Sequence, residues 1–256
     1  MLGKLLKYDL KNMLKFLSVF YIIALVISIP TRIFLGYSTP LILNIIGKVL
    51  SGTLIAIFCN ILINCLMRSW IKSFIYGIYG DEGYLTNTLP VTKAEIYLSK
   101  FLCAVISTVL SIAVIFACTF IAYYTGERWT LLKSIIPSLR FAAIFLGVCC
   151  LEFLSLIQCG FTGAIIGHRQ NRGKKGFSVL FGFITYTAWQ LVVLLFSAGA
   201  ALFSGDFKEL FVTASATTNP AMAENLLLWA IPLYAVIIIA NLFINIKLLN
   251  RGVNLD

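Results

Sequence analysis

Apolar residues fill six long stretches of the chain, and short polar segments separate these stretches. They cover residues 16–34, 41–67, 100–124, 141–167, 177–203 and 226–249. A helix needs about 20 apolar residues to cross the hydrocarbon core of a bilayer, and each stretch has about that length or more. None of them alternates apolar and polar residues as the strands of a membrane barrel do. The pattern therefore predicts an all-α, multi-pass membrane protein with six spans in a single domain, residues 1–256.

Composition agrees with this fold class. Hydrophobic residues make up 60% of the 256 residues, charged residues make up 12%, and the mean hydropathy is +0.96. A soluble globular protein of this composition would have too little polar surface to cover itself. We therefore expect most of the chain to be buried in lipid or in its own helices.

Lys and Arg residues gather on one side of the predicted spans. The side that holds the N-terminus carries fourteen: Lys4, Lys7, Lys11, Lys15, Arg68, Lys72, Lys93, Lys100, Arg169, Arg172, Lys174, Lys175, Lys247 and Arg251. The other side carries five: Arg32, Arg128, Lys133, Arg140 and Lys208. Because positive charge stays in the cytoplasm during insertion, we expect both termini to be cytoplasmic. This topology explains the net charge of +10, with attraction to anionic membrane lipid as a secondary effect, and nucleic-acid binding is not expected.

Residues 1–15 show a pattern of their own. Apolar residues recur there at helical spacing: Leu2, Leu5, Leu6, Leu10, Met13 and Leu14, followed by Leu17. The lysines Lys4, Lys7, Lys11 and Lys15 form a separate stripe. This pattern is typical of an amphipathic helix that lies in the cytoplasmic interface and then turns into the first span. The alternative is one long first helix with a basic end.

The connection between the second and third spans, residues 68–99, is long for a compact helical bundle. The sequence GDEG at residues 80–83 marks a turn, and Pro90 ends the segment that follows it. Thr92 and Glu95 fit a capping box, so we expect a new helix to begin there and to run into the third span. Between these signals lies the apolar sequence YLTNTL. An exposed apolar tip on a helical stem predicts a protein partner.

The string EGYLTNTLPVTKAEIYLSK, residues 82–100, resembles the cytoplasmic signature of permease subunits of the second class of ABC exporters, in particular small permeases of Gram-positive bacteria. The closing string LLNRGVNLD, residues 248–256, is similar to the end of those subunits. The resemblance implies a multi-pass protein of a bacterial cell membrane. It also implies that the connection docks, as a coupling helix, in a groove of an ATP-binding-cassette ATPase subunit. The contacts that it implies are Tyr79, Asp81, Glu82, Tyr84, Leu85, Leu89, Pro90 and Val91.

The sequence lacks a phosphate-binding loop of its own. The nearest candidate, GKKGF at residues 173–177, has neither the required spacing nor the Ser or Thr that holds magnesium. The resemblance therefore implies that ATP and Mg²⁺ bind to the separate ATPase subunit, and that a second permease copy or paralogue completes the transporter. We expect no catalytic residue and no cofactor in this chain. The seven cysteines lie within spans without metal-ligand spacing and His168 stands alone in a basic segment, so no metal site is expected either.

Four polar residues inside the spans are candidates for the translocation path: Glu152, Gln158, Asn60 and Asn64. Glu152 lies near the middle of the fourth span, where an ionised carboxyl that faces lipid is costly. A structural role is the alternative, because Gln158 or an asparagine of another helix could satisfy this carboxyl. Asn60 and Asn64 share one face of the second span, and interhelical hydrogen bonding is the favoured role for such residues.

Two further pairs predict helix packing. Asn241 and Asn245 share one face of the sixth span, where interhelical hydrogen bonds are again favoured. Gly163 and Gly167 form a small-xxx-small pair in the fourth span, which permits a close approach of another helix.

The leading hypothesis is a permease subunit that forms the translocation path of an ATP-driven exporter for an unidentified hydrophobic or peptidic substrate. An intramembrane enzyme that uses Glu152 ranks lower, because the sequence lacks the partner His, Asp or second Glu that such chemistry needs. The alternative is a membrane sensor or immunity protein that does not transport. A coupling connection would be superfluous in such a protein.

Overall fold

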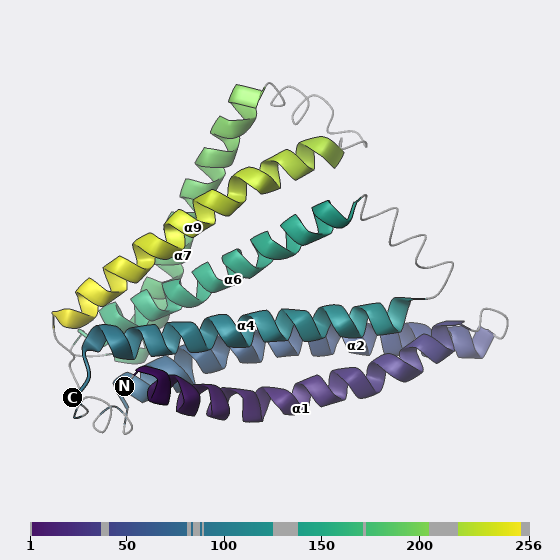
Figure 1. The fold of residues 1–256 in the computed structure, drawn as a ribbon, viewed down its shortest axis with the longest axis horizontal. Helices are drawn as coiled ribbons and strands as arrows, with labels where there is room; N and C mark the ends of the chain where they lie inside the picture. Colours follow the sequence, from purple (N-terminus) through teal and green to yellow (C-terminus); the bar gives the residue numbers. More distant parts are fainter. Residues whose placement is uncertain are drawn as a thin grey trace. The chain divides into compact units, whose positions relative to one another are not determined.

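The computed structural model describes residues 2–36, 41–80, 83, 88, 90–124, 138–170, 173–204 and 220–251. Its helices are α1 (Leu2–Gly36), α2 (Leu41–Met67), the π-helix η1 (Arg68–Tyr76), α4 (Lys93–Tyr123), α6 (Leu139–Gly167), α7 (Lys174–Ser204) and α9 (Pro220–Asn250) (Figure 1). No described residue belongs to a strand, and six helices are long and apolar enough to span a membrane. The predicted all-α, multi-pass fold is confirmed.

The chain forms two compact units, Met1–Ile135 and Ile136–Asp256. In the first unit, α1 packs against both α2 and α4 (Figure 1). The π-helix η1 continues directly from α2 and contacts α1 and α4. In the second unit, α6 packs against both α7 and α9. Each unit therefore has one helix that holds two others.

Helix α1 runs without interruption through the first 36 residues apart from Met1. The helix predicted over residues 1–15 is present, but the turn that was expected between it and the first span does not form. The sequence contains neither Gly nor Pro between Gly3 and Pro30, so nothing breaks the helix there. The 35 residues extend for about 52 Å. The alternative of one long first helix with a basic end therefore describes α1.

Small side chains of α4 let the helices of the first unit approach one another. One face of α4 buries Cys103, Ala104, Ser107, Thr108 and Ser111. The hydroxyls of Tyr21 in α1 and Ser111 lie 2.8 Å apart, and the thiol of Cys65 in α2 donates to the Ser107 hydroxyl at 3.6 Å. These contacts satisfy polar groups that lipid could not satisfy.

The connection between the second and third spans is shorter than the 68–99 predicted from the sequence. The helix continues beyond Met67 as η1, and helical geometry persists to Ile78. Apolar residues keep a helical spacing through this segment, at Trp70, Ile71, Phe74, Ile75 and Ile78, and the first cations at 68 and 72 do not end it. The connection proper therefore comprises residues 79–92.

Two glycines of α6 bring this helix into backbone contact with α7. A Cβ atom added to Gly163 would lie 2.3 Å from the backbone nitrogen of Gly182, and one added to Gly167 would lie 2.4 Å from that of Ser178. Side chains do not tolerate contacts this short, so these positions accept glycine alone. The close packing predicted for this pair is confirmed.

Candidate functional site

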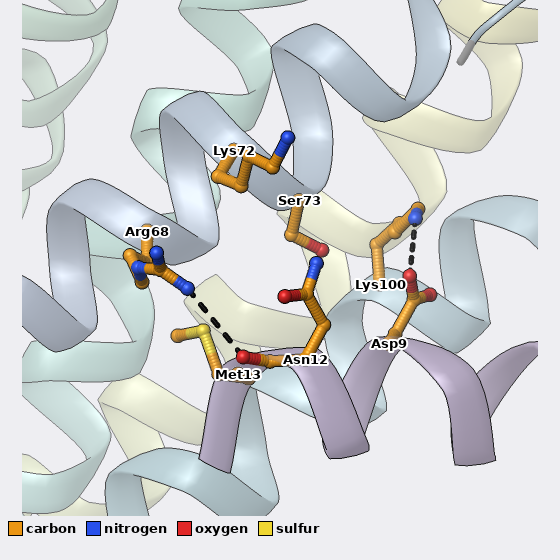
Figure 2. A pocket seen from close by; sticks show the side chains of 7 residues that line it. All are labelled: Asp9, Asn12, Met13, Arg68, Lys72, Ser73 and Lys100. Carbon is orange, nitrogen blue, oxygen red and sulfur yellow. Dashed lines mark hydrogen bonds and ion pairs between the residues drawn. The ribbon is translucent and has the colours of Figure 1, made fainter. Parts of the chain in front are cut away.

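A charged pocket lies at the end of the first unit where the connection begins. Asp9, Asn12, Met13, Arg68, Lys72, Ser73 and Lys100 line it. Figure 2 shows three of these side chains rising from α1, three from η1, and Lys100 from α4. The enclosed volume is about 20 Å³, which holds about one water-sized group. Three cations and one carboxylate give this lining an excess of positive charge.

An ion pair joins α1 to α4 at one wall of the pocket. The Lys100 ammonium donates to one oxygen of the Asp9 carboxylate at 2.6 Å, and the Ser99 hydroxyl donates to the other at 3.1 Å. The side chains of Lys100 and Asp9 are only 8% and 17% exposed. A buried ion pair with good geometry and one additional hydrogen bond is costly to break, because loss of one partner leaves the other charge uncompensated.

Arg68 joins the start of η1 to α1 at the opposite wall. Its guanidinium donates to the backbone carbonyl of Asn12 at 3.4 Å and lies 3.7 Å from the centre of the Phe16 ring. A guanidinium stacked on an aromatic ring is held by cation–π attraction while its edges stay available for further hydrogen bonds. In the part of the chain that the structure describes, no carboxylate forms an ion pair with Arg68.

The two segments that lead into and out of the connection also contact each other. We call them the stems: η1 with residues 77–78, and the first two turns of α4. The rings of Phe74 and Tyr97 meet edge to face at 6.1 Å, and both side chains are fully buried. A Cβ atom on Gly77 would lie 2.9 Å from the Lys100 ammonium, so the absence of a side chain there leaves room for this cation. The two stems therefore contact each other directly, and α1 contacts each of them.

The α4 stem begins at the predicted capping box, which is confirmed. The Thr92 hydroxyl accepts a hydrogen bond from the Glu95 amide at 3.3 Å, and the Glu95 carboxylate accepts one from the Thr92 amide at 3.0 Å. This second bond lowers the pKa of Glu95. The start of α4 is therefore fixed by its own local sequence.

The residues predicted to contact an ATPase are described in part. Tyr79, Pro90 and Val91 lie near the two ends of the connection, and the Tyr79 amide donates to the Ile75 carbonyl at 2.8 Å. Asp81, Glu82, Tyr84, Leu85 and Leu89 lie outside the described residues.

Sequence reasoning missed the residues that hold the stems together. Asp9 and Lys100 are 91 positions apart, and no local pattern pairs them. One signal was nevertheless present: Asp9 is the only acidic residue among the first 80, and it falls in the apolar stripe between Leu5 and Met13. A carboxylate on the buried face of a helix requires a buried cation.

Glu152 finds a partner other than the one proposed from the sequence. The Gln190 amide of α7 donates to its carboxylate at 3.3 Å. Gln158 does not reach it, because six positions along a helix place the two side chains on different faces. Gln158 is instead fully buried, and neither polar atom of its side chain has a hydrogen-bond partner among the described residues.

The asparagines of α9 make the interhelical bonds predicted for them. Asn241 accepts a hydrogen bond from the Trp189 indole of α7 at 2.9 Å, and Asn245 accepts one from the Thr162 hydroxyl of α6 at 2.8 Å. The Asn245 amide also donates to the Gln158 carbonyl at 3.4 Å. A polar cluster therefore joins all three helices of the second unit.

Asn60 and Asn64 behave differently, and the interhelical role favoured for them is wrong for the described residues. The Asn60 side chain donates to the Ala56 carbonyl at 2.9 Å, and the Asn64 side chain donates to the Asn60 carbonyl at 2.8 Å. An amide on an exposed helix face can satisfy its donor on the preceding turn, and these two residues do so.

His168, in the basic segment that follows the fourth span, is the buried C-cap residue of α6. Its Nδ1 lies 2.9 Å from the Ala164 carbonyl and 3.3 Å from the Ser178 hydroxyl of α7. Burial lowers the pKa of His168, and Lys174 and Lys175 act in the same direction. The ring therefore links α6 to α7.

Comparison with known proteins identified no relative of this chain. No family model matches the chain, and neither the curated proteins nor the solved structures contain a significant match. Function is therefore inferred from the residues and contacts described above.

Proposed function

We propose that this chain is the membrane-spanning permease subunit of an ATP-driven ABC exporter, which forms the translocation path and couples to a separate ATP-binding subunit. One observation carries the proposal: the connection between the second and third spans stands on two stems that contact each other and are both bound by α1. A connection with no mechanical role would not need this support.

The stems suit the transmission of a force from the connection to the spans. A displacement of residues 79–92 acts on η1 and on the start of α4, which the Phe74–Tyr97 contact obliges to move together. The ion pair to Lys100 and the Phe16 contact to Arg68 pass the same displacement to α1. All three spans of the first unit would then move in response to a partner that binds the connection.

The polar cluster of the second unit is the best candidate for a substrate path. Gln158 is buried with an amide that has no partner among the described residues, and a buried amide gains free energy from any polar group that reaches it. Glu152 lies on the same helix as Gln158, α6, and its carboxylate accepts a hydrogen bond from the Gln190 amide of α7. We propose that these groups contact the exported substrate in turn.

The proposed assembly follows from the resemblance in the connection. The partners are an ATP-binding-cassette ATPase that carries ATP and Mg²⁺, and a second permease copy or paralogue. The proposed location is a bacterial cell membrane, with the connection on the cytoplasmic side.

Copurification tests the proposal. The tagged chain is extracted from native membranes in mild detergent, and the stoichiometry of any ATP-binding-cassette subunit that accompanies it is measured. We expect wild type to retain such a subunit and Leu89→Asp to release it. The matched control is Tyr8→Asp, which places the same charge on a side chain of α1 that is 75% exposed and outside the connection.

A chain that emerges alone in several mild detergents would contradict the permease proposal and favour the sensor or immunity protein. Release of the ATPase by Tyr8→Asp as complete as by Leu89→Asp would contradict the placement of the coupling contact.

A further inference from the structure

The charged pocket lies at the level of the chain where three spans meet the membrane surface. Arg68 directly follows the apolar stretch 41–67, Lys100 directly precedes the apolar part of α4, and Asn12 precedes the apolar part of α1. Lipid phosphates lie at the same level, just outside the hydrocarbon core. A ligand that enters this pocket from the membrane surface would therefore present a headgroup.

The groups of the η1 wall match an oxyanion. Arg68 is held on the Phe16 ring and has no carboxylate partner among the described residues, so its charge is not neutralised there. The Ser73 hydroxyl is a buried donor that lines the pocket without a hydrogen-bond partner in the described chain. Lys72 also lines this wall, but its ammonium points away from Arg68 and Ser73 (Figure 2) and lies 5.8 Å from the centre of the Tyr76 ring. A phosphate accepts hydrogen bonds from a guanidinium and a hydroxyl such as those of Arg68 and Ser73.

The α1–α4 wall limits what else could bind. Both oxygens of Asp9 are engaged by Lys100 and Ser99, so this carboxylate does not neutralise the cations of η1. The enclosed volume of about 20 Å³ holds about one oxygen of a phosphate and not a whole solute. The remainder of the ligand must therefore lie outside the pocket, as the body of a lipid would.

We propose that the charged pocket binds the headgroup phosphate of an anionic phospholipid, with Arg68 and Ser73 as its ligands. Bound lipid would join η1 to α1 through Arg68 and would brace the stems of the connection. This binding requires neither an ATPase nor a transported substrate, so it stands or fails independently of the proposed function.

Native mass spectrometry of the full chain tests the proposal. The protein is released from vesicles of equimolar phosphatidylcholine and phosphatidylglycerol, and the two retained lipids are counted after stepwise delipidation. We expect wild type to retain phosphatidylglycerol in excess. Arg68→Gln should lower this excess about tenfold, the effect of losing a charge-assisted contact. Ser73→Ala should lower it about fivefold without any change of charge.

Lys15→Gln is the matched control, because it removes one exposed cation from the same end of α1 without touching the pocket. We expect it to keep the excess. If Lys15→Gln lowered the phosphatidylglycerol excess as much as Arg68→Gln does, the proposal would be overturned, because the lipid would then be held only by diffuse electrostatic attraction.

Equal retention of both lipids by wild type would also overturn the proposal. Displacement of phosphatidylglycerol by inorganic phosphate would assign the pocket to free phosphate in place of lipid. Ser73→Ala keeps the test valid should Arg68→Gln fail to fold.

Discussion

The two units use the same plan of one helix holding two others, but the contacts at one end of the first unit differ in kind from those between α6 and α7 in the second. At the end of the first unit that carries the connection, the contacts join the ends of side chains. The Lys100 ammonium meets the Asp9 carboxylate, and the Arg68 guanidinium lies on the Phe16 ring. In the second unit, backbone meets backbone at Gly163. Contacts between flexible side-chain ends can lengthen or rearrange, whereas contacts between backbones cannot. The contacts at this end of the first unit can therefore rearrange more easily than the contact at Gly163.

Glycine itself shows this contrast. Gly77 of the first unit faces the end of the flexible Lys100 side chain, whereas Gly163 of the second faces the backbone of Gly182. An added methyl group would displace a side chain in the first case and a whole helix in the second. Three substitutions sharpen this comparison.

The largest effect is expected for Gly163→Ala. The new methyl group would lie 2.3 Å from the Gly182 nitrogen, so α6 and α7 must separate, at a cost of about 3 kcal/mol. The midpoint of unfolding by sodium dodecyl sulfate in mixed micelles measures this cost. Gly147→Ala is the control on the same helix, because nothing lies within 4 Å of its added methyl group. Equal midpoints for the two variants would show that backbone contact does not hold this unit together.

An intermediate effect is expected for Asp9→Leu. It leaves the 8% exposed Lys100 side chain without its partner, and we expect a loss of about 2 kcal/mol in the same assay. The double variant Asp9→Leu with Lys100→Met should recover most of the loss, because two apolar side chains can replace a buried ion pair. A double variant less stable than the single one would mean that the charges of this pair cannot be replaced by packing.

The smallest effect is expected for Thr92→Ala, which removes the side-chain cap of α4 and costs about 1 kcal/mol. It also tests a pH dependence. Folding lowers the pKa of Glu95, so its ionised carboxylate stabilises the folded state. This stabilisation is fully present above the pKa of the unfolded chain and is lost as the pH falls through the lower pKa of the folded chain. Thr92→Ala keeps the bond from the backbone amide to this carboxylate but loses the one that the Thr92 hydroxyl donates to it at 3.2 Å. The stability difference between wild type and Thr92→Ala should therefore narrow below pH 4.5, the ordinary pKa of this group. A difference that stays constant in this range would exclude Glu95 from the cap.

Local signals in the sequence predicted much of this structure. Six apolar stretches predicted six helices, because the length needed to cross a bilayer is a property of each stretch alone. The capping box depends on residues only three positions apart, and it forms as predicted. The glycine pair of α6 predicted close packing, although the sequence could not show that Gly182 and Ser178 of α7 would be its partners.

Contacts between distant residues were the part that the sequence did not reveal. The partner of Glu152 is Gln190, 38 positions away on another helix, and no spacing rule selects it. Asn60 and Asn245 belong to identical i, i+4 patterns, yet one bonds within its own helix and the other bonds to α6. Which face of a span meets another helix decides between these outcomes, and hydropathy alone does not determine that face.

The ion pair between α1 and α4 also has a consequence for synthesis at the ribosome. Asp9 leaves the ribosome 91 residues before Lys100, its partner. At about 5 to 20 residues per second, the carboxylate waits roughly 5 to 18 s before the cation is made. During this interval it must remain in water or against headgroups, because hydrocarbon would not accept it. The carboxylate can therefore wait at the headgroup level, and the packing of α1 against α4 is expected to be completed only after the third span has been inserted.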